Sequence, residues 1–264
     1  MDHGPGKILS LKGLTKWYGE KLVLDQIDLD VYEGQIIGYI GPNGAGKSTT
    51  VKIMLGLEAS YSGEVEIFGQ NIKESGVAYK KRIGYVPEAA DLYDNLTARE
   101  YLTFTGELYG LSADSADYKA RLLMSVFDLE DVYDSRISSY SKGMKQKVLL
   151  ISSLLHDPDI LFLDEPINGL DANSVMVFKE ILAQLASQGK TIFYSSHIME
   201  VVQKISSRIL LLNDGKIVAD GSFEQLRQKN KEGSLEEIFN QLTGFNEHQN
   251  LAEDFVQIVQ RDHI

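Results

Sequence analysis

The 264-residue sequence contains no cysteine, and this absence excludes several classes of site. Without thiolates the chain forms no disulfide, no cysteine-ligated zinc site and no iron–sulfur cluster, and a reducing compartment suits it. Basic residues are also scarce, with 26 lysines and arginines against 38 acidic residues and a formal net charge of −12. Because neutralising phosphates requires a basic surface, this charge argues against a general nucleic-acid partner.

Long apolar runs are missing as well. The longest, near residues 148–155, is interrupted by Ser152 and Ser153, whereas a membrane-spanning helix needs about 20 apolar residues. The opening residues MDHGPGK lack the apolar core of a signal peptide, so we expect the protein to remain where it is made. At 43% hydrophobic residues, the chain can still bury a globular core.

A glycine-rich loop follows the apolar segment 36–40 and precedes a segment with helical spacing. Residues 41–48 read GPNGAGKS, which fits the pattern G-x-x-x-x-G-K-S of a phosphate-binding loop. Glycines suit this loop because backbone N–H groups must approach phosphate oxygens without an intervening Cβ. Lys47 would contact the β- and γ-phosphates, and Ser48 would bind Mg²⁺ beside the positive end of the helix. A turn that merely connects strand and helix is the alternative, which the strand–loop–helix setting disfavours.

Polar groups with catalytic potential follow two later apolar segments. Asp164 and Glu165 come directly after residues 160–163, and His197 lies two residues beyond the expected strand 191–195. Open α/β sheets bind ligands at the carboxyl ends of their strands. We therefore expect Asp164 to hold Mg²⁺, Glu165 to orient and deprotonate the attacking water, and His197 to hydrogen-bond the γ-phosphate. A solvated turn and a structural histidine are the alternatives.

Hydrophobic spacing and turn residues predict the remaining elements. Strands are expected at 7–12, 22–32, 64–68 and 83–86, and at 208–212 and 216–221 around the turn Asn213–Asp214–Gly215. From about residue 89 the pattern changes to helices with polar connections, which predicts a separate lobe. Helices are expected at 97–110, which begins at a capping box and stops at Gly110, at 115–127 and 142–155, and at 173–187, which is followed by Gly189.

The same spacing predicts which helix faces are buried. The inward residues are expected to be Leu122, Leu123, Val126 and Phe127 in the second of these helices, and Val177, Ile181 and Leu185 in the fourth. Capping boxes at Ser222 and Ser234 mark two short helices near the end. In residues 250–262 an apolar stripe of Leu251, Phe255 and Ile258 favours docking on its own domain over a partner surface.

Taken together, these motifs resemble the nucleotide-binding subunit of an ATP-binding cassette transporter over roughly residues 8–244. GPNGAGKST at 41–49 matches the phosphate loop of that family, and ILFLDEP at 160–166 matches its second nucleotide motif. The resemblance implies an α/β fold of the P-loop NTPase, RecA-like class: a parallel sheet core with an N-terminal antiparallel β subdomain and an inserted α-helical subdomain. The implied parts are the core at 7–88, the helical subdomain at 89–157, the remaining core at 158–221 and a C-terminal helical extension at 222–264.

The resemblance also assigns site residues. Spacing alone favours a surface or core aromatic at Tyr18, but in KWYG it lies where this family stacks a ring on adenine. NGLD at 168–171 falls at the dimer-contacting loop, and His197 at the switch histidine. The implied nucleotide-binding residues are Tyr18, Gly41, Pro42, Asn43, Gly44, Ala45, Gly46, Lys47, Ser48, Thr49, Ser141, Lys142 and Gly143. The implied Mg²⁺ ligands are Ser48, Glu88 and Asp164, and the implied catalytic residues are Glu165 and His197.

Two motifs depart from the family pattern. YSKGMKQ at 140–146 stands at the LSGGQ signature, so that Lys142 replaces a glycine while Ser141 and Gly143 are kept. Glu88 stands where many members carry a glutamine that contacts Mg²⁺. Both departures resemble variants found among bacterial multidrug and antibiotic-resistance exporter ATPases, including the Ecs-type subgroup.

The resemblance implies an ATP hydrolase with ATP and Mg²⁺ as cofactors. Two such subunits, identical or different, would close around ATP, and each signature helix would complete the nucleotide site of the other. A separate transmembrane permease would dock near residues 88–93, which places the protein in the cytoplasm on the inner face of the membrane. The alternatives are a soluble cassette ATPase acting on DNA or ribosomes, a non-catalytic ATP-dependent dimer clamp, and a small-molecule kinase or GTPase. The last of these would not be expected to carry YSKGMKQ.

Overall fold

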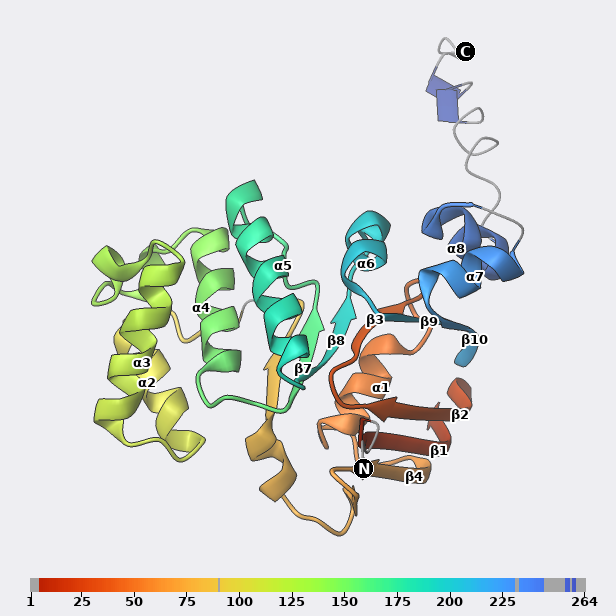
Figure 1. The fold of residues 1–264 in the computed structure, drawn as a ribbon, viewed down its shortest axis with the longest axis horizontal. Helices are drawn as coiled ribbons and strands as arrows, with labels where there is room; N and C mark the ends of the chain where they lie inside the picture. The colour runs from red at the N-terminus through yellow and green to blue at the C-terminus, as the bar shows by residue number, and fades with distance from the viewer. Residues whose placement is uncertain (1–4, 90, 231–232, 245–254, 257, 260–264) are drawn as a thin grey trace.

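The computed structural model describes residues 5–89, 91–230, 233–244, 255–256 and 258–259. A four-stranded sheet and a six-stranded sheet form the body of the protein. Figure 1 shows a group of helices at one end of the larger sheet and the smaller sheet below its other half. This arrangement agrees with the fold that the resemblance implies.

The smaller sheet is antiparallel, with strand order β2-β1-β4-β5. Its strands are β1 (Lys7–Tyr18), β2 (Lys21–Tyr32), β4 (Ser62–Ile67) and β5 (Gln70–Asn71). We expected the first strand to end at Lys12, and this was wrong. The strand continues to Tyr18 because it stays paired with β2 past an irregularity near Gly13, down to the pair Tyr18 and Lys21.

The larger sheet has strand order β10-β9-β3-β8-β7-β6, and all neighbours except β10 and β9 are parallel. Its strands are β3 (Ile36–Ile40), β6 (Ile83–Val86), β7 (Ile160–Asp164), β8 (Thr191–Ser195), β9 (Arg208–Asn213) and β10 (Lys216–Gly221). The apolar central strands are buried because α1 and the smaller sheet cover one face of this sheet and helices cover the other. The hairpin expected at Asn213–Gly215 is confirmed.

Helix α1 (Lys47–Met54) lies between the two sheets, where Ile53 and Met54 join a single hydrophobic cluster with residues of both. The opposite face of the larger sheet is covered by α5 (Ala172–Ser187), α6 (Met199–Ile205), α7 (Phe223–Lys229) and α8 (Leu235–Thr243). The capping boxes expected at Ser222 and Ser234 are both confirmed.

The helical lobe consists of α2 (Ala98–Leu108), α3 (Ala113–Val126) and α4 (Lys142–Leu154), with its own hydrophobic cluster. The buried face expected for α3 was wrong at two positions, since Leu122 and Val126 are 50% and 54% exposed. The helix instead buries small residues, including Ala116 and Ala120. Small side chains allow close packing on α2, where a Cβ at Gly106 would lie 2.6 Å from the Cβ of Ala116.

The inward face of α5 also differs from the expected one. Phe178 and Leu182 are fully buried against the sheet, whereas Val177 is 42% exposed and Ile181 and Leu185 are only partly buried. The spacing predicted a helix correctly, but the stripe that faces the sheet lies one residue further along the chain.

Most of the expected stripe in residues 250–262, including Leu251, lies outside the described residues. Phe255 and Ile258 are each 67% exposed, so the preferred docking on the chain's own domain finds no support in the described part of this segment. Within the described ranges, no helix combines the length and the apolar character needed to cross a membrane.

The contact between β6 and α4 leaves no room for a side chain at Gly84. A Cβ there would lie 2.3 Å from the carbonyl oxygen of Ser153 and 2.6 Å from Leu161. We expect Gly84→Ala to lower the free energy of unfolding by about 1–3 kcal/mol, since β6 and α4 would have to separate. Urea denaturation measures this change. The control is Gly6→Ala, whose Cβ would meet Glu33 at an ordinary 3.5 Å. Equal stability of the two variants would contradict the prediction.

Candidate active site

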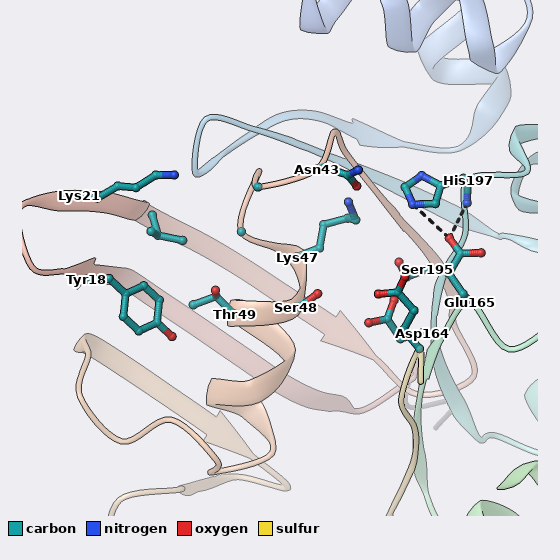
Figure 2. Close-up of a pocket in the computed structure, with 14 residues that line it drawn as sticks. Tyr18, Lys21, Asn43, Lys47, Ser48, Thr49, Asp164, Glu165, Ser195 and His197 are labelled. Atoms are coloured by element: carbon teal, nitrogen blue, oxygen red, sulfur yellow. Dashed lines mark hydrogen bonds and ion pairs between the residues drawn. The ribbon is translucent and has the colours of Figure 1, made fainter. Parts of the chain in front are cut away.

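The carboxyl ends of β3, β6, β7 and β8 lie at one edge of the larger sheet because these strands are parallel. A cavity of about 310 Å³ opens at this edge. Figure 2 shows Tyr18 at one end of it, Asp164, Glu165 and His197 at the other, and Lys47 and Ser48 between them. Residues expected to form one site from separate segments of the sequence thus surround one cavity.

The glycine-rich loop connects β3 to α1 and lines the centre of this cavity with Asn43, Gly44 and Gly46. Gly44 and Gly46 have φ angles of +81° and +107°, a conformation that other residues adopt only with strain. Gly41 needs to be glycine for a different reason, since a Cβ there would lie 2.2 Å from the carbonyl oxygen of Leu212. Gly41, Pro42 and Ala45 shape the loop but do not line the cavity.

Lys47 begins α1 and lies over the loop. Its ammonium donates to the carbonyl oxygens of Gly41 at 2.6 Å and Pro42 at 3.2 Å. Burial lowers the pKa of Lys47, and the carboxylates of Asp164, Glu165 and Glu88 oppose that shift. Ser48 and Thr49, the next residues of the helix, also line the cavity. A cation, two hydroxyls and the amino end of a helix therefore face the same space, which suits an anion.

Asp164 ends β7 opposite Ser195 of β8, and both residues line the cavity. Burial raises the pKa of Asp164 and the nearby Glu88 raises it further, while a hydrogen bond with Ser195 and the charge of Lys47 lower it. Glu88 follows β6 and also lines the cavity. The hydroxyl of Ser48 and the carboxylates of Asp164 and Glu88 thus form a set of oxygen donors.

Glu165 is held by the segment that follows β8. Its Oε1 accepts a hydrogen bond from the backbone N–H of His197 at 2.7 Å, and its Oε2 accepts one from Ser196 Oγ at 3.2 Å. His197 Nε2 lies 3.6 Å from Oε1 (Figure 2). Burial raises the pKa of Glu165, and these interactions with His197 and Ser196 oppose the shift. Glu165 also adopts φ +47°, an uncommon conformation that costs about 1–3 kcal/mol.

Ser141, Lys142 and Gly143 do not line the cavity. Ser141 caps α4, its hydroxyl accepting from the backbone N–H of Met144 at 3.2 Å. A Cβ at Gly143 would lie 2.4 Å from the carbonyl oxygen of Gly169, so the start of α4 packs directly on the segment 168–171. Ser141, Lys142 and Gly143 therefore lie together, outside the cavity that Lys47, Asp164 and Glu165 line.

Sequence reasoning missed several groups that the structure brings to the site. Ser195 and Ser196 contact the two carboxylates, and the sequence SSH before the histidine was the available signal. Lys21 and Val23 line the cavity beside Tyr18, and no motif marked them. They reach the cavity because β2 pairs with β1 next to Tyr18.

Comparisons with known proteins agree on one family. A family model described as ABC transporter matches residues 24–168. An ABC transporter ATP-binding protein of Methanocaldococcus jannaschii is 38% identical over 84% of this chain and 80% of its own length. The bacitracin transport ATP-binding protein of Bacillus licheniformis is 34% identical over 85% of this chain and 72% of its own. EcsA of Bacillus subtilis, an ABC-type transporter ATP-binding protein, is 32% identical over 89% of this chain and 96% of its own length.

Solved structures give the same result. The ATP-binding subunit of an ABC transporter superposes with a TM-score of 0.84 at 31% identity, covering 89% of this chain and 99% of that one. A dimeric, post-hydrolysis ATP-binding cassette with bound ADP and phosphate superposes with a TM-score of 0.75 at 26% identity, covering 81% and 98%. They confirm the predicted P-loop NTPase fold.

The geometry of the loop predicts the effect of a side chain at Gly46. Besides its strained φ, a Cβ there would lie 2.5 Å from Leu24 and 2.9 Å from the carbonyl oxygen of Val23. We expect Gly46→Ala to weaken the binding of magnesium tripolyphosphate by about 10-fold or more, measured by calorimetry. Gly69→Ala is the control, because Gly69 has φ +73° but open space around it and lies outside the cavity. Equal losses of affinity would contradict the prediction.

Proposed function

This chain belongs to the ABC transporter family of ATP-binding proteins, and we propose that its ATP hydrolysis powers export through a separate membrane permease. It is an ATP hydrolase with ATP and Mg²⁺ as cofactors. One observation carries the proposal: the phosphate loop, two carboxylates and a histidine, which come from three separate strands, surround one cavity. The division into a core at 7–88 and 158–221, a helical subdomain at 89–157 and an extension at 222–264 remains part of this proposal.

In this proposal the adenine stacks on Tyr18 and the phosphates lie along the loop. Backbone N–H groups of the loop and the amino end of α1 surround the phosphates, and Lys47 places a positive charge beside them. The phosphate-binding residues are Gly41, Pro42, Asn43, Gly44, Ala45, Gly46, Lys47, Ser48 and Thr49.

Mg²⁺ fits the donors that face the phosphate position. Ser48, Asp164 and Glu88 would hold it, and when bound it supplies positive charge that neutralises the phosphate oxygens. Among the described residues no group of three or more histidine, aspartate or glutamate side chains forms a metal site by itself. Mg²⁺ takes few carboxylates and completes its shell with water and substrate phosphates.

Glu165 is proposed to deprotonate the water that attacks the γ-phosphate. Its raised pKa makes it a stronger base, and its fixed carboxylate reduces the ordering needed at the moment of reaction. His197 holds this carboxylate through its backbone N–H and is proposed to hydrogen-bond the γ-phosphate with its ring. Ser196 supports the same carboxylate from the other oxygen.

A second nucleotide-binding subunit is proposed to complete the site. Ser141, Lys142 and Gly143 form the start of α4 away from their own cavity, so they can meet a phosphate only in another copy. The dimeric structural relative with ADP and phosphate supports this arrangement. Whether the two subunits are identical is left open by the proposal.

The permease is proposed to dock on the helical lobe near Glu88–Tyr93, which places this chain on the cytoplasmic face of a membrane. Tyr93 is 66% exposed and lies beside Tyr101 of α2. Phe104 and Leu108, also on α2, are 48% and 64% exposed and extend the apolar surface. Export is the proposed direction because one relative, the Nod factor export ATP-binding protein I of Burkholderia lata, is 34% identical over 81% of this chain and 70% of its own length.

The proposed base gives a direct test of the chemistry. We expect Glu165→Gln to lower kcat by about 100-fold or more, because an amide cannot take the proton from water. ATP binding should persist, so that the variant accumulates closed dimers visible by light scattering after gel filtration. The control is Glu200→Gln on the exposed surface of α6. Normal hydrolysis by Glu165→Gln would remove Glu165 from this role.

Coupling to a permease is tested by purifying the tagged protein from detergent-solubilised membranes. We expect a polytopic membrane protein to be recovered with it, and we expect Phe104→Glu to reduce that recovery several-fold without changing the ATPase rate of the isolated chain, because a charge would disrupt an apolar contact. Tyr118→Glu, at a residue on α3 that is 70% exposed, is the control. Recovery only with ribosomes or DNA would contradict coupling and favour a soluble cassette ATPase.

A further inference from the structure

A buried lysine lies next to the proposed adenine position and has no part in the proposed chemistry. The side chain of Lys16, in β1, is only 4% exposed. Its ammonium forms an ion pair with Glu58 Oε1 at 3.0 Å and donates to the carbonyl oxygen of Ser60 at 2.5 Å. Burying a charge is costly unless it is paired and hydrogen-bonded, so this position calls for an explanation.

The carboxylate of Glu58 connects this lysine to Tyr18. The Tyr18 hydroxyl donates to Glu58 Oε2 at 3.0 Å, while Oε1 accepts from the backbone N–H of Ser60 at 2.9 Å. The hydrogen bonds from Ser60, Lys16 and Tyr18 lower the pKa of Glu58, which therefore stays an ionised acceptor. Tyr18 is thus anchored at its outer end, beyond the ring.

Lys16 also touches the ring itself. Its ammonium lies 4.4 Å from the centre of the Tyr18 ring, within the range of a cation–π contact. Lys16 is buried, whereas Tyr18 is 46% exposed and lines the cavity. One face of the ring is therefore covered by the lysine, and the face left for a base is the opposite one.

Glu58, which holds Tyr18, is also connected to the phosphate end of the cavity through α1. That helix begins at Lys47 and Ser48, and the backbone N–H groups of Leu57 and Glu58 donate to the carbonyl oxygen of Lys52 near its end. Glu58 is thus fixed to the helix that positions the phosphates. Helix α1 therefore sets the distance between the Tyr18 ring and the phosphate loop.

We infer that Lys16 and Glu58 are positioning residues that fix the Tyr18 ring as a preformed stacking surface for adenine. This inference rests on the proposed function, in which Tyr18 stacks on the base. Neither residue contacts the nucleotide. A ring that is already held in place loses less freedom when ATP binds, so the pair strengthens the binding of the base and leaves the chemical step alone.

The test compares ATP with inorganic tripolyphosphate, which has the phosphates but no base. Lys16→Met keeps most of the buried stem without the charge, Glu58→Ala removes the bridge, and Tyr18→Phe keeps the ring without its anchor. We expect each to raise KM for ATP about 3-fold to 10-fold, the size of a lost cation–π contact or charged hydrogen bond. In Lys16→Met and Glu58→Ala, kcat and the inhibition constant of tripolyphosphate should stay unchanged.

Lys12→Met is the matched control, because Lys12 lies on the same strand and pairs with Glu64 and Glu66 at the exposed surface. Equal weakening of ATP and tripolyphosphate by Lys16→Met would overturn the inference by showing that Lys16 shapes the loop. An unchanged KM would also overturn it. Should Lys16→Met fail to fold by thermal melting, Tyr18→Phe and Glu58→Ala decide the question.

Tyr18→Ala separates this inference from the proposed function. A normal KM in Tyr18→Ala would show that the ring does not bind the base, and both the stacking role and its positioning would fail. A raised KM in Tyr18→Ala, with normal values in Lys16→Met, Glu58→Ala and Tyr18→Phe, would preserve the stacking role and overturn the positioning alone.

Discussion

Parallel pairing of β3, β6, β7 and β8 is the constraint on which the rest of the molecule depends. Because these strands run the same way, their carboxyl ends meet at one edge, and each end carries a polar group into the same cavity. Both faces of the sheet are buried, one by α1 and the smaller sheet and the other by helices, so the strands can be apolar throughout and their ends carry the polar groups. The proximity of these polar groups is therefore a product of topology.

Two buried charged residues near this cavity, Glu165 and Lys16, are stabilised by local hydrogen bonds and an ion pair. Burial disfavours the ionised carboxylate of Glu165, and its positive φ adds backbone strain. The backbone N–H of His197 and the hydroxyl of Ser196 compensate by donating to its two oxygens. At the other end of the cavity Lys16 is a buried charge, compensated by Glu58 and Ser60. In both places these contacts hold a residue that lines the cavity, Glu165 at one end and Tyr18 at the other.

The helical lobe connects to the same edge through short, close contacts. Gln146 of α4 donates to the carbonyl oxygen of Pro166 at 3.0 Å, and Gly143 packs on Gly169. Lys147, also on α4, pairs with Asp171 at 3.4 Å. The start of α4 is therefore joined to the segment that follows the carboxylates of β7. A displacement of this segment would be transmitted to the residues that the proposed function presents to a second subunit.

The sequence by itself determined the chemistry and the local structure of this protein. The phosphate loop, Asp164 and Glu165, the capping boxes and the 213–215 turn are encoded by neighbouring residues, whose backbone preferences and hydrogen bonds act over a few positions. The tertiary structure alone decided which face of α3 and α5 is buried, that β1 extends to Tyr18, that Lys21 lines the cavity, and that Lys16 and Ser196 contact Tyr18 and Glu165. The physical reason is that these outcomes depend on the shape and pairing of segments far apart in the chain. Spacing within one segment does not contain that information.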